Sequence, residues 1–152
     1  MDTSEHFEII SYSGCGNIKF GMTPAEVESE LGAPDQVSEN YLNQRVEFRS
    51  FMNVAYSNGD EPRLNHIGFG RQMEAVTYKE LKLFKEDPFT VLKELARSDS
   101  HPYVYLGFVV FLDLGITLTG FHDEDESQKA IALFEKGAWD ARIKKMKPFV
   151  IV

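Results

Sequence analysis

The residues whose side chains could carry chemistry are few and lie far apart in the sequence. Cys15 stands between two glycines, which places a small thiol in a turn. A catalytic cysteine needs a neighbouring base and surroundings that favour its thiolate. None of the four histidines shows a spacing to Cys15 typical of such an enzyme: His6, His66, His101 and His122. The sequence therefore favours a free thiol in a tight turn over a nucleophile.

A run of four carboxylates follows His122. Carboxylate oxygens suit a hard cation, but the run lacks the glycine and the spaced ligands of a calcium-binding loop. We therefore expect neither a metal site nor a cofactor. The run is better interpreted as a solvated turn that forms a contact patch for a basic partner. Its members are Asp123, Glu124, Asp125 and Glu126.

The C-terminal stretch 136–147 brings five basic side chains close to the single tryptophan, Trp139. A basic helix with an aromatic residue could bind RNA or an anionic surface. The whole chain, however, carries a net charge of −8, from 24 acidic and 16 basic residues, which argues against a nucleic-acid partner. The sequence also contains no phosphate loop, zinc-ligand spacing, nucleophile elbow or dinucleotide fingerprint. It therefore predicts a protein that is not an enzyme.

Composition indicates a globular protein of the cytoplasm. One cysteine excludes an internal disulfide, and the acidic segment 1–10 does not look like a signal peptide. The most apolar run, 103–112, has about half the ~20 residues that a membrane-spanning helix needs. We expect no membrane partner. A chain of 152 residues, 43% of them hydrophobic, suffices for a single domain with one buried core.

Among the elements that must position these residues, a helix start is the best specified. Thr23 is a suitable N-cap, Pro24 fits the first helical position, and Glu26 completes a capping box. Gly32 supplies a C-terminal stop. The sequence therefore predicts a short helix that begins at Pro24.

Alternation of apolar and polar residues predicts strands through most of the remaining chain. In the segment Arg-Val-Glu-Phe-Arg, Val46 and Phe48 are predicted to face the core, and the charged side chains to face solvent: Arg45, Glu47 and Arg49. Further strands are expected near residues 7–11, 52–56, 64–69, 75–84, 103–112 and 115–121.

Two segments of the chain, 20–35 and 84–99, resemble each other when they are aligned from end to end without gaps. The identical pairs are Phe20/Phe84, Pro24/Pro88, Val27/Val91, Glu30/Glu94, Leu31/Leu95 and Asp35/Asp99. Further along the chain, the turns and the alternation of apolar residues also agree when the two halves are aligned at this offset of 64 residues. This offset predicts a second helix that opens at Asp87 and Pro88, and a strand near 130–134.

These patterns together predict one α+β domain over residues 1–152. Two pseudo-repeated strand-helix-three-strand units, about 7–71 and 76–135, form an antiparallel sheet with the helices packed on one face. The spacing of Trp139, Ile143 and Met146 adds a C-terminal helix within the tail 138–152.

The stretch 18–35 resembles the Gly-Met-Thr-x-x-x-Val-x-x-x-Leu-Gly-x-Pro-Asp helix start of small bacterial α/β modules. The matching residues are Gly21, Met22, Thr23, Val27, Leu31, Gly32, Pro34 and Asp35. Such modules include the outer-membrane assembly lipoproteins of the SmpA/OmlA type and the β-lactamase-inhibitor-protein fold, a tandem of such units. The chain lacks the lipid-acceptor cysteine of the former and the paired cysteines of the latter. It is also similar in type to cytosolic immunity proteins of bacterial toxin systems, and all of these resemblances imply binding to other proteins.

We therefore expect a non-enzymatic, intracellular protein-binding module, such as an inhibitor or immunity protein that neutralises a basic toxin domain. The binding surface would be the sheet face that the helices leave open, with aromatic and charged side chains as anchors. The candidate anchors are Tyr41, Arg45, Arg49, Tyr56 and the acidic run from Asp123 to Glu126.

Two alternatives stay open. The first is a small-molecule-binding protein or cryptic enzyme with a pocket between helices and sheet, whose candidate polar groups are Cys15, His66 and Tyr78. The second is a structural subunit or chaperone-like adaptor that forms a homodimer or larger homo-oligomer through the aromatic run 103–112.

Overall fold

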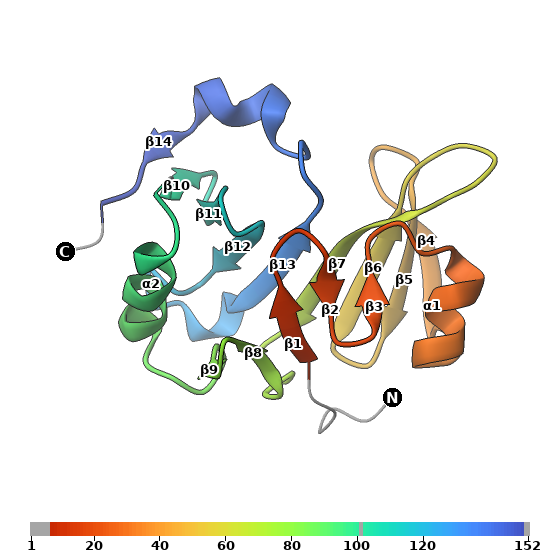
Figure 1. The fold of residues 1–152 in the computed structure, drawn as a ribbon, viewed down its shortest axis with the longest axis horizontal. Helices are drawn as coiled ribbons and strands as arrows, with labels where there is room; N and C mark the ends of the chain where they lie inside the picture. The colour runs from red at the N-terminus through yellow and green to blue at the C-terminus, as the bar shows by residue number, and fades with distance from the viewer. Residues whose placement is uncertain (1–6, 101, 151–152) are drawn as a thin grey trace.

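β-strands dominate the computed structural model (Figure 1), which describes residues 7–100 and 102–150. Strands account for 37% and helices for 19% of the described residues. The predicted α+β class is therefore wrong. The helices are short, and a second, smaller sheet shares with them the face that they were expected to cover alone. Two of the four histidines, His6 and His101, lie outside the described residues.

The larger sheet has nine strands, and all neighbouring pairs in it are antiparallel. Their order is β14 (Lys147–Pro148), β10 (Pro102–Tyr105), β11 (Phe108–Phe111), β12 (Ile116–Thr119), β13 (Ala130–Phe134), β7 (Leu64–Gly70), β6 (Met52–Tyr56), β5 (Arg45–Arg49) and β4 (Gln36–Glu39).

The smaller sheet has five strands, which come from the two segments that precede the helices. Their order is β3 (Ile18–Lys19), β2 (Gly14–Cys15), β1 (Phe7–Ile10), β8 (Val76–Tyr78) and β9 (Leu81–Lys82). β1 and β8 are parallel, and this pair joins the two segments.

The two α-helices begin where the sequence predicts. α1 (Pro24–Leu31) has Thr23 as its N-cap, and a capping box forms because the Thr23 hydroxyl and the Glu26 carboxylate each accept the other's backbone N–H, at 3.2 and 3.0 Å. α2 (Pro88–Arg97) has Asp87 as its N-cap. Both helix starts are confirmed. Within the described ranges, no helix has the length and apolar character needed to cross a membrane.

Two predictions about the second half are wrong. The run 103–112 is not one strand, because a turn at Leu106 and Gly107, with φ of 49° and 87°, divides it into β10 and β11. The strand expected near 75–84 is likewise divided into β8 and β9, by a turn at Lys79 and Glu80 with φ of 46° and 70°.

A C-terminal helix is present as predicted, but it is the 3-10 helix η2 (Asp140–Lys145) and not an α-helix. A 3-10 helix rises about 2 Å per residue against 1.5 Å for an α-helix, which suits a segment that must reach from β13 to the outer edge of β10. A second 3-10 helix, η1, spans Glu126–Gln128.

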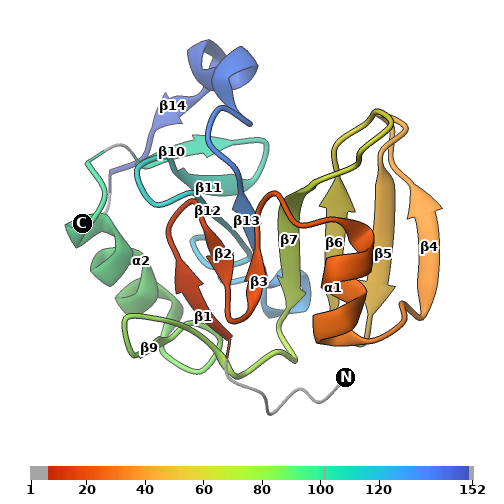
Figure 2. The same cartoon turned by 45° about the vertical axis from the view of Figure 1, so that its right-hand side comes forward.

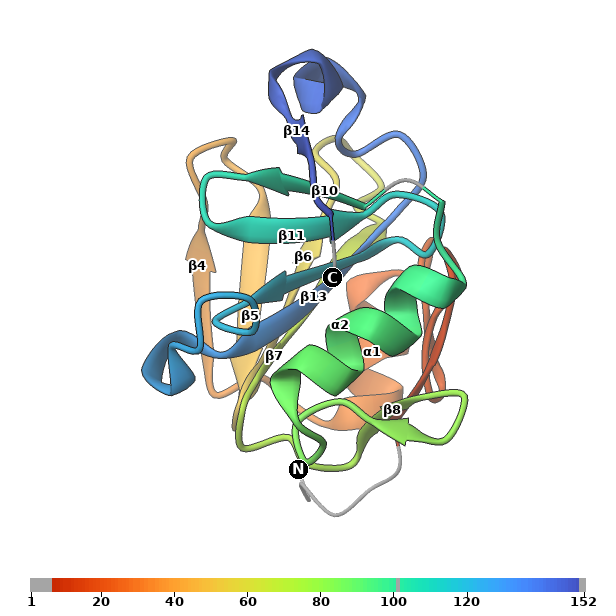
Figure 3. The same cartoon turned by 90° about the vertical axis from the view of Figure 1, so that its left-hand side faces the viewer.

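The main hydrophobic core lies between one face of the large sheet and a layer made of the helices and the small sheet (Figure 3). Each contributor buries large apolar side chains, among them Ile67 and Phe111 from the large sheet, Ile18 from the small sheet, Val27 from α1 and Leu95 from α2. We call this face the helix side of the large sheet and the opposite face its open side.

The middle of the large sheet is the pair β7–β13, which confirms the strand predicted near 130–134. Its register pairs Ile67 with Leu133, Gly68 with Ala132 and Phe69 with Ile131. Gly68 and Ala132 are also equivalent positions in the sequence alignment of the two halves. The strands of the two halves are therefore arranged with approximate twofold symmetry about the pair β7–β13. An internal duplication stays a prediction.

β5 is a strand as predicted, but its two faces are reversed. Phe48 lies on the open side and is 39% exposed, whereas Glu47 and Arg49 are each 2% exposed on the helix side. Burial is possible because the charges are paired. The Glu47 carboxylate accepts hydrogen bonds from Arg45, Arg49 and Tyr56 at 2.7 to 2.9 Å.

Candidate functional site

The open side of the large sheet contains a hollow of about 360 Å³ over β7 and β13. One row of paired residues crosses the sheet through this hollow: Gln36, Phe48, Asn53, Gly68, Ala132, Thr117, Val110, Tyr103 and Pro148. The smallest side chains stand in the middle of the row, and bulkier ones stand on both sides. The hollow follows from that order.

Glycine and alanine form the floor of the hollow: Gly68 and Gly70 in β7, and Ala130 and Ala132 in β13. A Cβ atom added at Gly68 would lie 2.9 Å from Nδ2 of Asn53. The Asn53 amide therefore lies directly over the backbone of β7. Larger side chains at these floor positions would fill the hollow from below.

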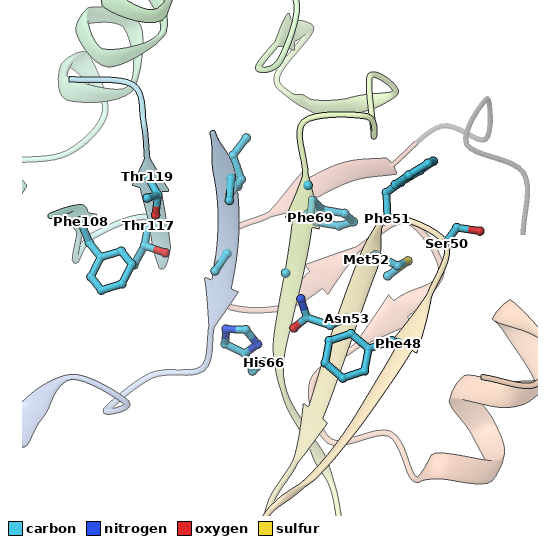
Figure 4. Close-up of a pocket in the computed structure, with 15 residues that line it drawn as sticks. Phe48, Ser50, Phe51, Met52, Asn53, His66, Phe69, Phe108, Thr117 and Thr119 are labelled. Atoms are coloured by element: carbon cyan, nitrogen blue, oxygen red, sulfur yellow. The ribbon is translucent and has the colours of Figure 1, made fainter. Parts of the chain in front are cut away.

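Aromatic rings stand on both sides of this floor (Figure 4). Phe48 in β5 and Phe51 in the β5–β6 turn line one side and are 39% and 46% exposed. Phe108 in β11 lines the other side. Exposed aromatic side chains gathered around a concave surface are typical of protein-protein contact sites.

The polar groups of the hollow are uncharged. They are one imidazole, one amide and three hydroxyls, from His66, Asn53, Ser50, Thr117 and Thr119. Burial lowers the pKa of His66, so its imidazole is neutral at pH 7. None of the described residues that line the hollow is Asp, Glu, Lys or Arg, although these types make up 26% of the chain. The hollow therefore favours an uncharged group.

One end of the hollow borders a negatively charged turn. Thr119 and Ala130 both line the hollow, and the segment that joins them contains the four carboxylates of Asp123–Glu126. All four residues are exposed. The Nζ atom of Lys129 lies 3.7 Å from Oε2 of Glu126 and balances one of these charges. The turn as a whole stays acidic.

The other predicted anchors do not line the hollow. Arg49 and Tyr56 are buried on the helix side beside Glu47. The Arg45 side chain is 47% exposed, but its Nε atom lies 2.7 Å from Oε2 of Glu47. Tyr41 is 77% exposed in the β4–β5 loop, where its hydroxyl accepts a hydrogen bond from an arginine of η2. Of the candidate anchors, the acidic turn alone borders the hollow.

The three groups predicted for a pocket between helices and sheet are not brought together. Cys15 and Tyr78 belong to the small sheet and are 1% and 7% exposed, whereas His66 lines the hollow on the open side. Cys15 is in a strand and not in an exposed turn. Burial and the nearby carboxylate of Glu8 raise the pKa of its thiol, which makes it a poor nucleophile.

Sequence reasoning missed the residues of the hollow, apart from His66. Their signal is an alternation of small with large side chains in two strands. Gly68 and Gly70 flank Phe69, and Ala130 and Ala132 flank Ile131. Because successive side chains of a strand point to opposite faces, this alternation places all the small residues on one face.

In the part of the chain that the structure describes, no group of three or more His, Cys, Asp or Glu is placed to hold a metal ion. No protein-family model, curated protein or solved structure matches the chain. The resemblance to the SmpA/OmlA-type and β-lactamase-inhibitor-protein modules therefore stays a prediction. Function has to be inferred from the geometry of the open side.

Proposed function

We propose that the protein is a non-enzymatic binding module that neutralises a basic partner protein, as an inhibitor or immunity protein does. The observation that carries the proposal is the uncharged hollow with aromatic walls, which is bordered at one end by the acidic turn Asp123–Glu126. The single cysteine, buried in β2, suits a reducing compartment, and we place the interaction in the cytoplasm.

The hollow suits a large apolar side chain that projects from the partner. A ring or branched aliphatic group between Phe48 and Phe108 would be removed from water on both of its faces. It would meet no unpaired charge, so no desolvation cost of a buried ion would oppose binding. A central apolar anchor surrounded by polar groups is the arrangement found at energetically dominant contacts.

The acidic turn adds a second requirement. Carboxylates beside the hollow attract lysine and arginine side chains, which raises the association rate at low salt and disfavours acidic partners. The partner therefore needs an apolar side chain with basic residues close to it. Replacing Asp123 to Glu126 by their amides should slow association and weaken its dependence on salt.

The proposal is tested by capture of a partner from the source cells, followed by titration of the purified partner against matched variants. Phe48→Ser removes a wall of the hollow, and Ala132→Leu fills its floor. Phe89→Ser is the control, because Phe89 on α2 is 40% exposed and Phe48 is 39% exposed. We expect Kd to rise at least ~10-fold for the first two variants. A captured protein that binds all three variants alike would contradict the proposal.

A small uncharged ligand is the second candidate for the same hollow. Its volume of about 360 Å³ lies within the ~300–1,000 Å³ usual for ligand pockets. Asn53, His66 and Thr117 could orient the polar groups of such a ligand. Native mass spectrometry of the purified protein separates the two candidates. A non-protein mass that is retained by the native chain and lost in Ala132→Leu would favour the ligand.

A further inference from the structure

The two ends of the nine-stranded sheet are covered differently. At one end, β14 pairs with the outer edge of β10, with Tyr103 opposite Pro148 and Val104 opposite Lys147. β4 holds the equivalent place in the first half, because it follows α1 as β10 follows α2. Among the described residues, β4 pairs with β5 alone. Its outer edge therefore pairs with no strand of the described part of the chain (Figure 2).

The β4 edge lacks several of the features that usually prevent strand pairing. Proteins protect exposed edges with proline, charged side chains (lysine above all), bulges or very short strands, and β4 contains no proline, lysine or bulge. The far end of the sheet has these features, since β14 is two residues long and consists of Lys147 and Pro148. β4 has four residues, Gln-Val-Ser-Glu, and Val37 is 44% exposed. It can therefore accept another strand, whereas β14 cannot.

The charges around β4 decide which strand would fit. Asp35 and Glu39 stand at its two ends, and Glu28 and Glu30 lie on the last turns of α1, which leads directly into it; all four are exposed. The nearest exposed cation on β5, Arg45, is already paired with Glu47. A second copy would bring an equal set of carboxylates against this edge. A lysine- or arginine-containing strand would meet opposite charges.

We propose that the outer edge of β4 binds an extended, basic segment of another protein by strand addition. Backbone hydrogen bonds would supply affinity, and alternate basic side chains would supply preference for this edge. β14 shows the kind of segment that covers the equivalent edge, since it is extended and contains lysine. This surface is separate from the hollow, and the inference does not depend on the proposed function.

The test uses two fluorescein-labelled peptides of equal charge. Thr-Lys-Val-Lys-Val-Lys-Thr can form a strand, whereas Thr-Lys-Pro-Lys-Pro-Lys-Thr cannot, because proline lacks the N–H and resists pairing. Fluorescence anisotropy with the full chain at low salt should show at least ~10-fold tighter binding of the valine peptide. Hydrogen exchange should slow at β4 on addition of that peptide and stay unchanged at β14.

Variants locate the binding edge. Val37→Pro blocks pairing at the edge directly. The double variant Val37→Lys with Glu39→Lys makes the edge basic without introducing proline, so the test can still be made if Val37→Pro unfolds the protein. Either variant should weaken binding of the valine peptide at least ~10-fold. The hollow variant Phe51→Ser should leave that binding unchanged, so this test and the test of the proposed function can fail independently.

Three outcomes would overturn the inference. Equal binding of the two peptides would reduce the effect to charge attraction. Slowed exchange confined to the turn Asp123–Glu126 would place the peptide elsewhere. A dimer measured by light scattering, and lost in the Val37→Lys, Glu39→Lys variant, would show that a second copy occupies the edge.

Discussion

The two halves of the molecule share an order of elements but are stabilised by different interactions on the helix side. α2 buries three apolar side chains, Val91, Leu92 and Leu95, whereas α1 buries Val27 alone. The strands that pack against the two helices also differ in the polarity of their buried side chains. Where the first half has the buried Glu47, which pairs with Val54, the equivalent position of the second half has the fully buried Val109, which pairs with Leu118. The α2 half has an apolar core, and the α1 half contains an ion network.

The ion network beneath α1 is held at its centre by the Glu47 carboxylate. Burial alone would raise the pKa of this group, but hydrogen bonds from Arg45, Tyr56 and Arg49 outweigh burial and lower the pKa. Arg49 also donates from Nε to the carbonyl of Gly32 at 2.9 Å, where a cation is favoured by the C-terminus of α1. Its Nη2 atom is buried and has no hydrogen-bond partner among the residues that the structure describes.

On the open side of the large sheet, the two halves differ in how far their aromatic side chains are exposed. In the second half, the C-terminal segment covers the sheet, and Trp139 contacts the rings of Tyr105, Phe108 and Phe134 at centroid distances of 6.0 to 6.4 Å. In the first half, Phe48 and Phe51 stay exposed. The second half therefore covers more of its aromatic side chains on the open side than the first half does.

The largest expected effect is at the ion network. Glu47→Gln leaves two buried or half-buried arginines without their counter-charge, and breaking a buried pair in this way costs roughly 3–5 kcal/mol of unfolding free energy. The native pKa of Glu47 is lowered, so its contribution is present above the ordinary glutamate pKa and is lost as the pH falls through the native value. The unfolding free energy of the variant, measured by urea denaturation, should therefore also fall less steeply than that of the native chain as the pH is lowered.

The exposed Glu39 on β4 provides the control for this change. Glu39→Gln should alter the unfolding free energy by no more than about 0.5 kcal/mol. A cost below about 1 kcal/mol for Glu47→Gln would mean that the network does not stabilise the α1 half. The contrast between an ionic and an apolar half would then fail.

β5 also shows how far the sequence can predict this surface. Its alternation identifies a strand correctly, but charge suggests that Glu47 and Arg49 face water. The opposite is true because Arg45 and Tyr56, the latter from the neighbouring strand, satisfy the carboxylate. A network of this kind depends on pairing across strands, which a single sequence does not display. As a result, the sequence wrongly predicts Phe48 in the core and does not identify it as a wall of the hollow.

Local signals are more reliable than long-range ones in this chain. The capping box at Thr23 and the helix start at Asp87 depend on neighbours three positions away, and both are confirmed. The offset between the two halves correctly places β13, although helix propensity also suits its residues. The small sheet is missed because its parallel pair β1–β8 joins Phe7 to Val76 and Glu8 to Thr77, long-range contacts that no local pattern encodes.

The second expected effect compares the helices. Leu95→Ala should cost about 3 kcal/mol of unfolding free energy, since the side chain is fully buried against the core. Val27→Ala, at the one side chain of α1 that is fully buried, removes fewer buried carbons and should cost about 1–2 kcal/mol. Chemical denaturation measures both. Equal costs would show that α1 depends on apolar packing as much as α2 does.

The third effect concerns the cover of the second half. Trp139→Ala removes the ring that holds the C-terminal segment over β10 and β11, and a half-buried aromatic should cost about 2 kcal/mol. Hydrogen exchange should quicken in β10 and β14 and stay unchanged in β4 and β5. Lys145→Ala, an exposed position on the same 3-10 helix, is the control. Uniform quickening across the sheet would contradict a local cover.

The smallest expected effect lies in the hollow itself and depends on pH. Burial lowers the native pKa of His66, whereas the unfolded imidazole titrates near about 6.5. The unfolded chain then binds more protons between these two values, so the unfolding free energy falls as the pH drops below about 6.5 and levels off below the native pKa. His66→Gln should remove this part of the slope and leave stability above about pH 7.5 little changed. Parallel slopes for the native chain and the variant would show that water or a neighbouring group already accommodates the imidazolium, and the hollow would then accept a cation as readily as an uncharged group.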